Sequence, residues 1–165
     1  MAQGTLALFN EFAKSIGDGR IDLDTDSFAV GLTTLQVGGT PTIAETDPIP
    51  HWNGTGTTNI QASEVAAGGG YSAGGITLAA PVWSQTSGVA TCDHNAGEAS
   101  ITWTSSASGD PATIKSAVIY KTTGNKDCIG FIDMTADGTT AISLLAGDVT
   151  ITWNASGIFT VTNPP

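Results

Sequence analysis

The segment Cys128-Ile129-Gly130-Phe131-Ile132-Asp133-Met134 carries apolar side chains at both odd and even positions. Successive side chains of a strand point to opposite faces, so a strand formed by this segment is apolar on both sides. That pattern is typical of a strand at the centre of a sheet or in an interface. The sequence therefore predicts a buried β-strand here, with Cys128 packed as a small hydrophobe.

Shorter strands are predicted on both sides of this segment, separated by turn signals. Alternating apolar residues such as Phe28, Val30 and Leu32 mark half-buried strands. A spacing of roughly 8–15 residues between turns is typical of an antiparallel β-sandwich or barrel-like domain, so the expected fold class is all-β. The predicted strands lie at 27–33, 76–84, 89–92, 100–104, 114–121, 149–153 and 158–162.

The N-terminal stretch follows a different period. Leu6, Phe9, Ala13 and Ile16 fall at i, i+3, i+7 and i+10, which is one apolar stripe of a helix. Residues 1–17 are therefore predicted to form a short amphipathic N-terminal helix or arm. A helix of this length is marginal alone, so it would dock either on its own sheet or on a neighbouring subunit.

Between about 36 and 75 the alternation disappears. Proline dipeptides and the glycine run at 68–70 leave no long regular element in this part of the chain. Irregular loops of this length inside a compact domain are often functional or ordered by a partner. We therefore expect a single β-rich domain at 18–165 that carries an extended irregular loop at about 36–75.

The charge balance narrows the possible partners. The 165-residue chain has 15 acidic residues against five basic ones, a net charge of −10 and a pI near 4.1. A chain this acidic repels phosphate backbones, so nucleic acid is not an expected partner. A hydrophobic content of 40% argues against disorder, and no apolar run is long enough to span a membrane. Without a secretory signal pattern, synthesis in the cytoplasm is expected. A reduced cytoplasm favours free thiols at Cys92 and Cys128, and a single disulfide between them is the alternative.

The motifs for metal binding are incomplete. Asp22, Asp24 and Asp26 have the spacing found at the start of a calcium loop. That loop needs a glycine at its sixth position and an acid at its twelfth, where this chain has Ser27 and Thr33. The three aspartates are therefore interpreted as a solvated acidic face, and no metal is expected.

The motifs for catalysis are incomplete as well. Asp93 and His94 are adjacent, so on a strand their side chains point to opposite faces. His51 lies in a proline-rich loop, and neither histidine has a nucleophile at a recognisable spacing. Both are interpreted as ordinary turn residues. We expect no enzyme activity and no cofactor.

The four tryptophans leave one binding function open. Trp103 and Trp153 each share a predicted strand face with an isoleucine two residues earlier, which predicts two core residues. Trp52 and Trp83 stay free for a surface role. They would allow a host-glycan-binding β-sandwich that stacks sugars on aromatic rings.

A set of short stretches, in the same order along the chain, carries a family resemblance. These stretches are 5–12 (TLALFNEF), 19–26 (GRIDLDTD), 70–78 (GYSAGGITL), 117–124 (AVIYKTTG), 129–133 (IGFID) and 151–159 (ITWNASGIF). Taken together they resemble the capsid decoration (cement) proteins of tailed bacteriophages. The likeness covers most of the chain outside 36–60, and it departs at Met134, where the family usually has phenylalanine.

The resemblance implies a non-catalytic structural protein that is made in the host bacterial cytoplasm and resides on the outer capsid surface of the virion. Its implied partners are the major capsid protein, whose adjacent subunits it would clamp, and copies of itself in a symmetric oligomer such as a trimer. Related sequences also serve the tail or the head–tail connection, which leaves that placement as the alternative. We expect Leu6, Phe9, Phe12 and Trp52 to make the capsid or subunit contacts, together with the loop at 36–75.

Overall fold

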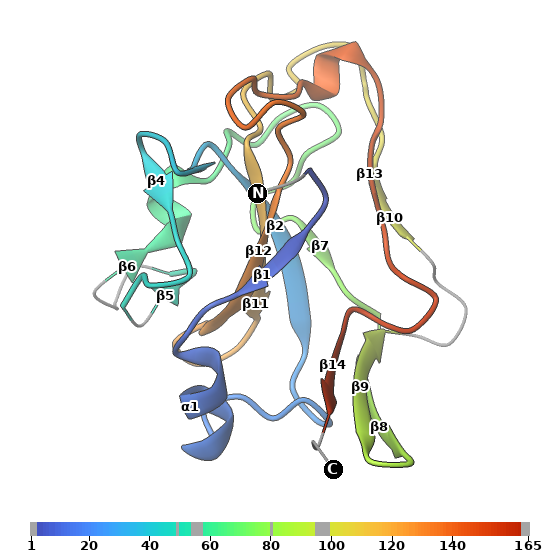
Figure 1. Ribbon diagram of the computed structural model, residues 1–165. Helices are drawn as coiled ribbons and strands as arrows, with labels where there is room; N and C mark the ends of the chain where they lie inside the picture. Colours follow the sequence, from blue (N-terminus) through green and yellow to red (C-terminus); the bar gives the residue numbers. More distant parts are fainter. Residues whose placement is uncertain (1–2, 49, 54–57, 80, 95–99, 163–165) are drawn as a thin grey trace.

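A five-stranded antiparallel sheet forms the centre of the molecule (Figure 1). The computed structural model describes residues 3–48, 50–53, 58–79, 81–94 and 100–162. In sheet order the strands are β1 (Leu6–Leu8), β12 (Cys128–Asp133), β11 (Ser116–Lys121), β2 (Phe28–Thr33) and β7 (Ile76–Thr77). Every residue of β2 and β12 is buried, as the two-sided apolar pattern of β12 predicts.

The two faces of this central sheet bury two separate groups of apolar side chains. In β11, Ala117 and Ile119 belong to the larger core, whereas Val118 and Tyr120 belong to the smaller one. Strand side chains alternate between faces, so one strand can contribute to both cores only if both faces are covered. Other elements cover each face, and the predicted all-β, sandwich-like fold is confirmed.

The larger core lies between the central sheet and two smaller antiparallel sheets. The first of these pairs β10 (Ser100–Trp103) with β13 (Val149–Thr152), and Ile101 lies opposite Ile151. The second, which we call the outer sheet, has the order β14 (Phe159–Thr162), β9 (Val89–His94) and β8 (Pro81–Thr86). The single predicted strand at 76–84 is therefore two strands, β7 and β8, in different sheets. A short 3-10 helix, η2 (Leu144–Ala146), buries Leu144 in the same core.

The opposite face of the central sheet is covered by the described residues 36–48, 50–53 and 58–63, which we call the cap. In Figure 1 its strands β4, β5 and β6 lie on one side of the central sheet, and β10 and β13 lie on the other. Its elements are β3 (Gln36–Val37), β4 (Thr42–Ile43), β5 (Pro50–His51), β6 (Thr58–Asn59) and the 3-10 helix η1 (Ile60–Ser63). The pairs β3–β4 and β5–β6 are parallel.

The cap corrects the expectation of an extended irregular loop at 36–75. Ile43, Trp52 and Ile60 are at most 1% exposed and pack into the smaller core. The cap is therefore a packed layer of the molecule. Its short elements are anchored by single side chains, which leave no repeating pattern in the sequence.

The predicted N-terminal helix over 1–17 is only half correct. A helix is present, but α1 spans Phe12–Gly17, and the stretch Leu6–Leu8 before it is the edge strand β1, paired with β12. Ala7 faces the smaller core, and the flanking Leu6 and Leu8 pack against the larger one. An edge strand with apolar contacts on both faces mimics the spacing of a helical stripe. No helix in the described part of the chain is long and apolar enough to cross a membrane.

Candidate interaction surface

The apolar residues predicted to contact partners at the N-terminus lie in the protein's own core. Phe9 is 2% exposed and packs against Phe131 with ring centroids 5.2 Å apart. Phe12 is also buried and makes an edge contact with Phe159 at 5.3 Å. Leu6 is half-buried against the larger core. The expected interface role is therefore corrected for Phe9 and Phe12, because intramolecular packing already covers these side chains.

Trp52 is likewise a core residue, which removes the predicted pair of sugar-stacking rings. Its ring is fully buried and stacks on Tyr120 with centroids 4.5 Å apart and planes 5° from parallel. Trp52 belongs to the smaller core, whereas Trp83 packs against the larger core on the other side of the central sheet. The two rings cannot form one platform. The expected interface role of Trp52 is corrected for the same reason.

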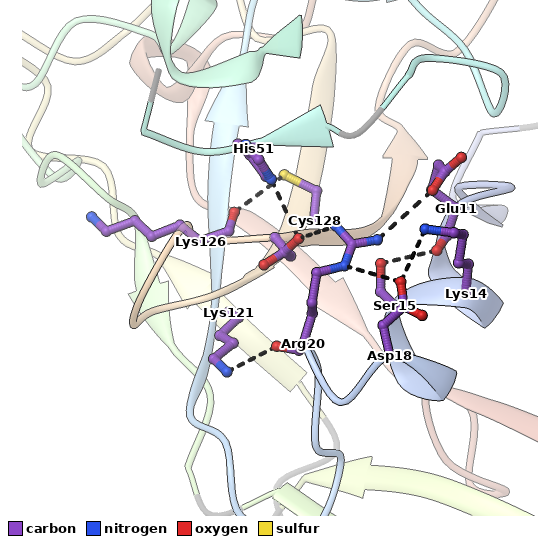
Figure 2. A network of polar contacts seen from close by, with 10 residues as sticks. Glu11, Lys14, Ser15, Asp18, Arg20, His51, Lys121, Lys126 and Cys128 are labelled. Atoms are coloured by element: carbon purple, nitrogen blue, oxygen red, sulfur yellow. Dashed lines mark hydrogen bonds and ion pairs between the residues drawn. The ribbon is translucent and has the colours of Figure 1, made fainter. Parts of the chain in front are cut away.

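A buried polar junction joins the cap to the central sheet (Figure 2). Oδ1 of Asp127 lies 2.8 Å from Nη1 of Arg20 and 3.3 Å from Nε2 of His51. The backbone N–H of Trp52 donates to the carbonyl of Lys126 at 2.9 Å. His51 is therefore a buried residue of β5, which corrects its interpretation as a turn residue. The sequence holds no signal for this junction, because its three side chains come from distant segments.

The two cysteines are buried and free. Burial raises the pKa of the Cys92 thiol to about 12 and raises the pKa of the Cys128 thiol well above its usual value. The thiolate is the form that attacks electrophiles and binds metals, so neither cysteine is prepared for that chemistry at neutral pH. Among the described residues there is no group of three or more His, Cys, Asp or Glu side chains placed to hold a metal ion.

The aspartates at 22–26 form a turn on the surface. Oδ1 of Asp22 accepts hydrogen bonds from the backbone N–H groups of Asp24 and Thr25, at 2.9 and 3.3 Å. Asp26 accepts from the backbone N–H of Asp22 and pairs with Lys121 at 2.8 Å. The bonds from Asp24 and Thr25 lower the pKa of Asp22, so its exposed carboxylate is charged at neutral pH.

The exposed apolar side chains gather near the outer sheet. Among the described residues, the exposed large apolar side chains are Ile16, Val82, Leu145 and Val161. Three of the four come from α1, β8 and β14, which lie at the same end of the molecule in Figure 1. Residues 81–92 and 156–162 contain no charged side chain. The two stretches at this end are therefore uncharged and expose Val82 and Val161, whereas α1 beside them carries Lys14.

The outer sheet also has two open edges. Within the described residues, β8 and β14 each pair only with β9, so each has one side whose backbone groups are not in the ladder. Soluble proteins usually protect such edges with charges, prolines or bulges. Here the only proline in these three strands is Pro81, at the start of β8.

A cleft of about 320 Å³ lies where the outer sheet meets α1 and the loop that follows it. We call it the Trp83 cleft. Trp83, whose ring is tilted against Phe159 with centroids 6.5 Å apart, lines this cleft, and so does Asp22. Its lining residues are Ile16, Gly19, Ile21, Asp22, Leu23 and Trp83. The cleft and the outer sheet together form the candidate interaction surface.

Comparisons of the chain with protein-family models, curated proteins and solved structures find no match.

Proposed function

We propose that the protein is a non-catalytic decoration protein of a tailed-bacteriophage capsid. It binds the outer surface of the shell and clamps adjacent major capsid subunits. The observation that carries this proposal is the outer sheet, in which Asp93 is the one Asp, Glu, Lys or Arg residue. Within the described residues both of its edges are open, and it exposes the side chains of Val82 and Val161. A clamp functions through contact area and shape, and this surface offers both without any catalytic group.

The outer sheet supports a protein as the partner. Open strand edges bind extended protein segments through main-chain hydrogen bonds, and exposed side chains on alternate positions add specificity. Val82 and Val161 are 40% and 49% exposed, so their contact with a partner would remove apolar area from water. A partner that covers this surface also protects the edges from unwanted pairing.

The family resemblance supports the same proposal through a different part of the molecule. The stretches 117–124 and 129–133 include most of β11 and β12, and 151–159 runs from β13 into β14. The resemblance therefore concerns the framework of the fold. The outer edges of the sheet at β8 and β14 supply the surface that this chain would present to the shell.

The test is co-sedimentation with purified empty shells and, separately, with purified tails. We expect the wild-type protein to saturate the shells. Val161→Asp places a charge on the outer sheet, and contact with the shell would bury that charge without a partner. We therefore expect this variant to bind shells more than about tenfold more weakly than the wild type. Leu145→Asp is the matched control, because Leu145 is similarly exposed, at 47%, but lies in η2 outside the outer sheet.

Two results would contradict the proposal. The first is wild-type protein that remains in the supernatant with shells but sediments with tails, which would favour the tail-associated alternative. The second is equal shell binding by Val161→Asp and Leu145→Asp, which would remove the outer sheet from the contact. Circular dichroism of both variants checks that they remain folded.

A further inference from the structure

The walls of the Trp83 cleft are apolar, and part of them is open to solvent. Ile16 at the end of α1 is 37% exposed, although its neighbours on the helix, Phe12 and Ser15, are buried. Trp83 packs against the larger core but is only partly buried. A side chain with an aliphatic portion would fill this space and remove apolar surface from water.

The cleft also contains a carboxylate that has no ion-pair partner within 4 Å among the described residues, although Lys121 attracts it over a longer distance. Among the described residues, neither Asp22 nor Asp24 forms an ion pair, whereas the neighbouring Asp18 and Asp26 are each paired with a lysine. Asp22 lines the cleft and its carboxylate is ionised. An uncharged occupant would remove this carboxylate from water and leave it only its backbone hydrogen bonds and the distant Lys121, which is costly. A negatively charged occupant would be repelled. The charge of the cleft therefore selects a cation.

We propose that the Trp83 cleft receives a lysine or arginine side chain of the capsid shell protein. This inference rests on the proposed function and names the chemistry of its contact. The aliphatic stem lies against Ile16 and the Trp83 ring, and the cationic head pairs with the carboxylate of Asp22. An aromatic ring and a carboxylate together suit such a side chain, because the ring face attracts the cation and the carboxylate accepts its hydrogen bonds.

The position of the cleft favours a side chain on a protein over a free amine. Trp83 belongs to β8, so the cleft continues directly into the outer sheet that would contact the shell. The whole chain has a net charge of −10, which attracts a basic partner surface over a longer range. The outer sheet then provides contact area, and the cleft sets the register of the clamp on the shell.

The first experiment uses small probes that imitate the side chain. The indole N–H signals of the labelled protein are followed by NMR during titration with N-acetyl-arginine methylamide. N-acetyl-norleucine methylamide, which has a similar stem but no charge, is titrated in parallel. The Trp83→Phe variant identifies the Trp83 signal. We expect the arginine probe to shift that signal at millimolar concentration and the norleucine probe to leave it unchanged. Equal shifts with both probes, or none with either, would overturn the proposal.

The second experiment removes the charge of Asp22 without removing its turn. In Asp22→Asn the amide oxygen can still accept the two backbone hydrogen bonds. Asp137→Asn is the matched control: Oδ1 of Asp137 also accepts two backbone hydrogen bonds, at 2.9 and 2.6 Å, in an exposed turn beyond the far end of β12. Both variants lose one negative charge.

We expect Asp22→Asn to bind shells about threefold to fivefold more weakly than Asp137→Asn at low salt. This loss of affinity corresponds to the free energy of a partly exposed ion pair. The difference should shrink at high salt, because added ions screen exposed charges. Equal binding by the two variants at low salt would overturn the cleft proposal and leave the capsid function in place. An arginine-specific shift of Trp83 without any shell binding by the wild type would retain the basic-side-chain site and overturn the capsid function.

Discussion

At the scale of single residues, Gly31 is the point where the cap comes closest to the central sheet. A β-carbon at this position would overlap the six-membered ring of Trp52. Trp52 is fully buried and is held from its other side by the ring of Tyr120. The ring therefore has no room to move away from a larger residue. The absence of a side chain at Gly31 is what allows the cap to pack on β2.

We expect Gly31→Ala to lower the free energy of unfolding by about 1–3 kcal/mol, the usual cost of overpacking a core. Gly17→Ala is the control, since a β-carbon there meets no atom within 4 Å. Gly17 is in α1, where alanine is the better helix former. Urea unfolding followed by tryptophan fluorescence measures both. Equal midpoints for the two variants would show that the contact between Gly31 and Trp52 does not limit packing.

Asp110 joins two loops through hydrogen bonds to its carboxylate. It accepts from the backbone N–H of Gly70 at 2.5 Å, from the backbone N–H of Ser106 at 2.8 Å, and from the hydroxyl of Ser105 at 3.1 Å. The bond from Gly70, followed by those from the serines, holds the pKa of Asp110 below its usual value. The folded state therefore binds the Asp110 proton less tightly than the unfolded state does.

This shift predicts a loss of stability in acid. A lowered pKa contributes stability above the unfolded value, near pH 4, and the contribution is lost as the pH falls through the folded value. Asp110→Asn should be less stable than wild type at neutral pH and should show a flatter decline below about pH 4. Asp24→Asn, at an exposed carboxylate, should follow the wild-type curve. Urea midpoints between about pH 6 and about pH 2.5 test this, and parallel curves for all three proteins would contradict it.

The tryptophans show which buried side chains can be predicted from the sequence. Trp103 is correctly predicted as a core residue, because it shares a strand face with a nearby isoleucine and the strand period reports that face. Trp52 stands among turn residues with no period around it. Its burial depends on Gly31 and Tyr120, which are distant in sequence. A contact between one side chain and a distant glycine produces no local sequence pattern, so the burial of Trp52 could not be predicted.

At the scale of elements, Arg20, His51 and Asp127 form one of the contacts between the cap and the rest of the molecule, beside the packing of Trp52 on Tyr120. Asp127 is buried, and Arg20 reaches it from the loop after α1 while His51 reaches it from the cap. Removing the carboxylate leaves a guanidinium that is partly buried without its closest partner. Such a loss weakens the attachment of β5 more than it weakens the central sheet.

We therefore expect Asp127→Ala to cost about 3 kcal/mol of stability, as the loss of one partner of a buried ion pair does. Amide hydrogen exchange in the cap should accelerate before exchange in β2, β11 and β12 does. Asp18→Ala is the control: it removes an exposed carboxylate that also lies near Arg20, at 3.9 Å, and should leave exchange in the cap unchanged. Uniform acceleration across all strands in Asp127→Ala would contradict a local role for the junction.

The strands were more predictable than the N-terminal segment or the cap for a physical reason. β10 and β13 bury every second residue, and β11 and β12 are buried on both faces, so their apolar residues follow the strand pattern in the sequence. β1 has only three residues and apolar contacts on both faces, and a helix follows it closely. Its spacing therefore fits a helical stripe as well as a strand.

At the scale of the whole molecule, charge and apolar surface are separated. The net charge is −10, but Asp93 is the one Asp, Glu, Lys or Arg residue in the three strands of the outer sheet. Repulsion between copies therefore acts over the rest of the molecule, and the outer sheet is where two copies meet the least repulsion. Near the pI of about 4.1 this long-range repulsion disappears.

We expect self-association to increase between neutral pH and the pI, measured by sedimentation velocity, with circular dichroism at each pH to confirm that the protein is folded. Val161→Asp should associate less than Leu145→Asp at the same pH, because only the first variant places a charge on the outer sheet. Equal association by the two variants would show that other surfaces bring the copies together.

The pairing of β1 with β12 has a consequence for the order of events during synthesis. Leu6 lies opposite Ile132. During translation β1 is therefore made long before β12, the strand with which it pairs. Until β12 has been made, β1 and β11 both lack the strand that lies between them. Pairings between distant segments form slowly, because a long loop must close first. β1 therefore has no partner strand until synthesis has passed Asp133, and the central sheet is completed only after that point.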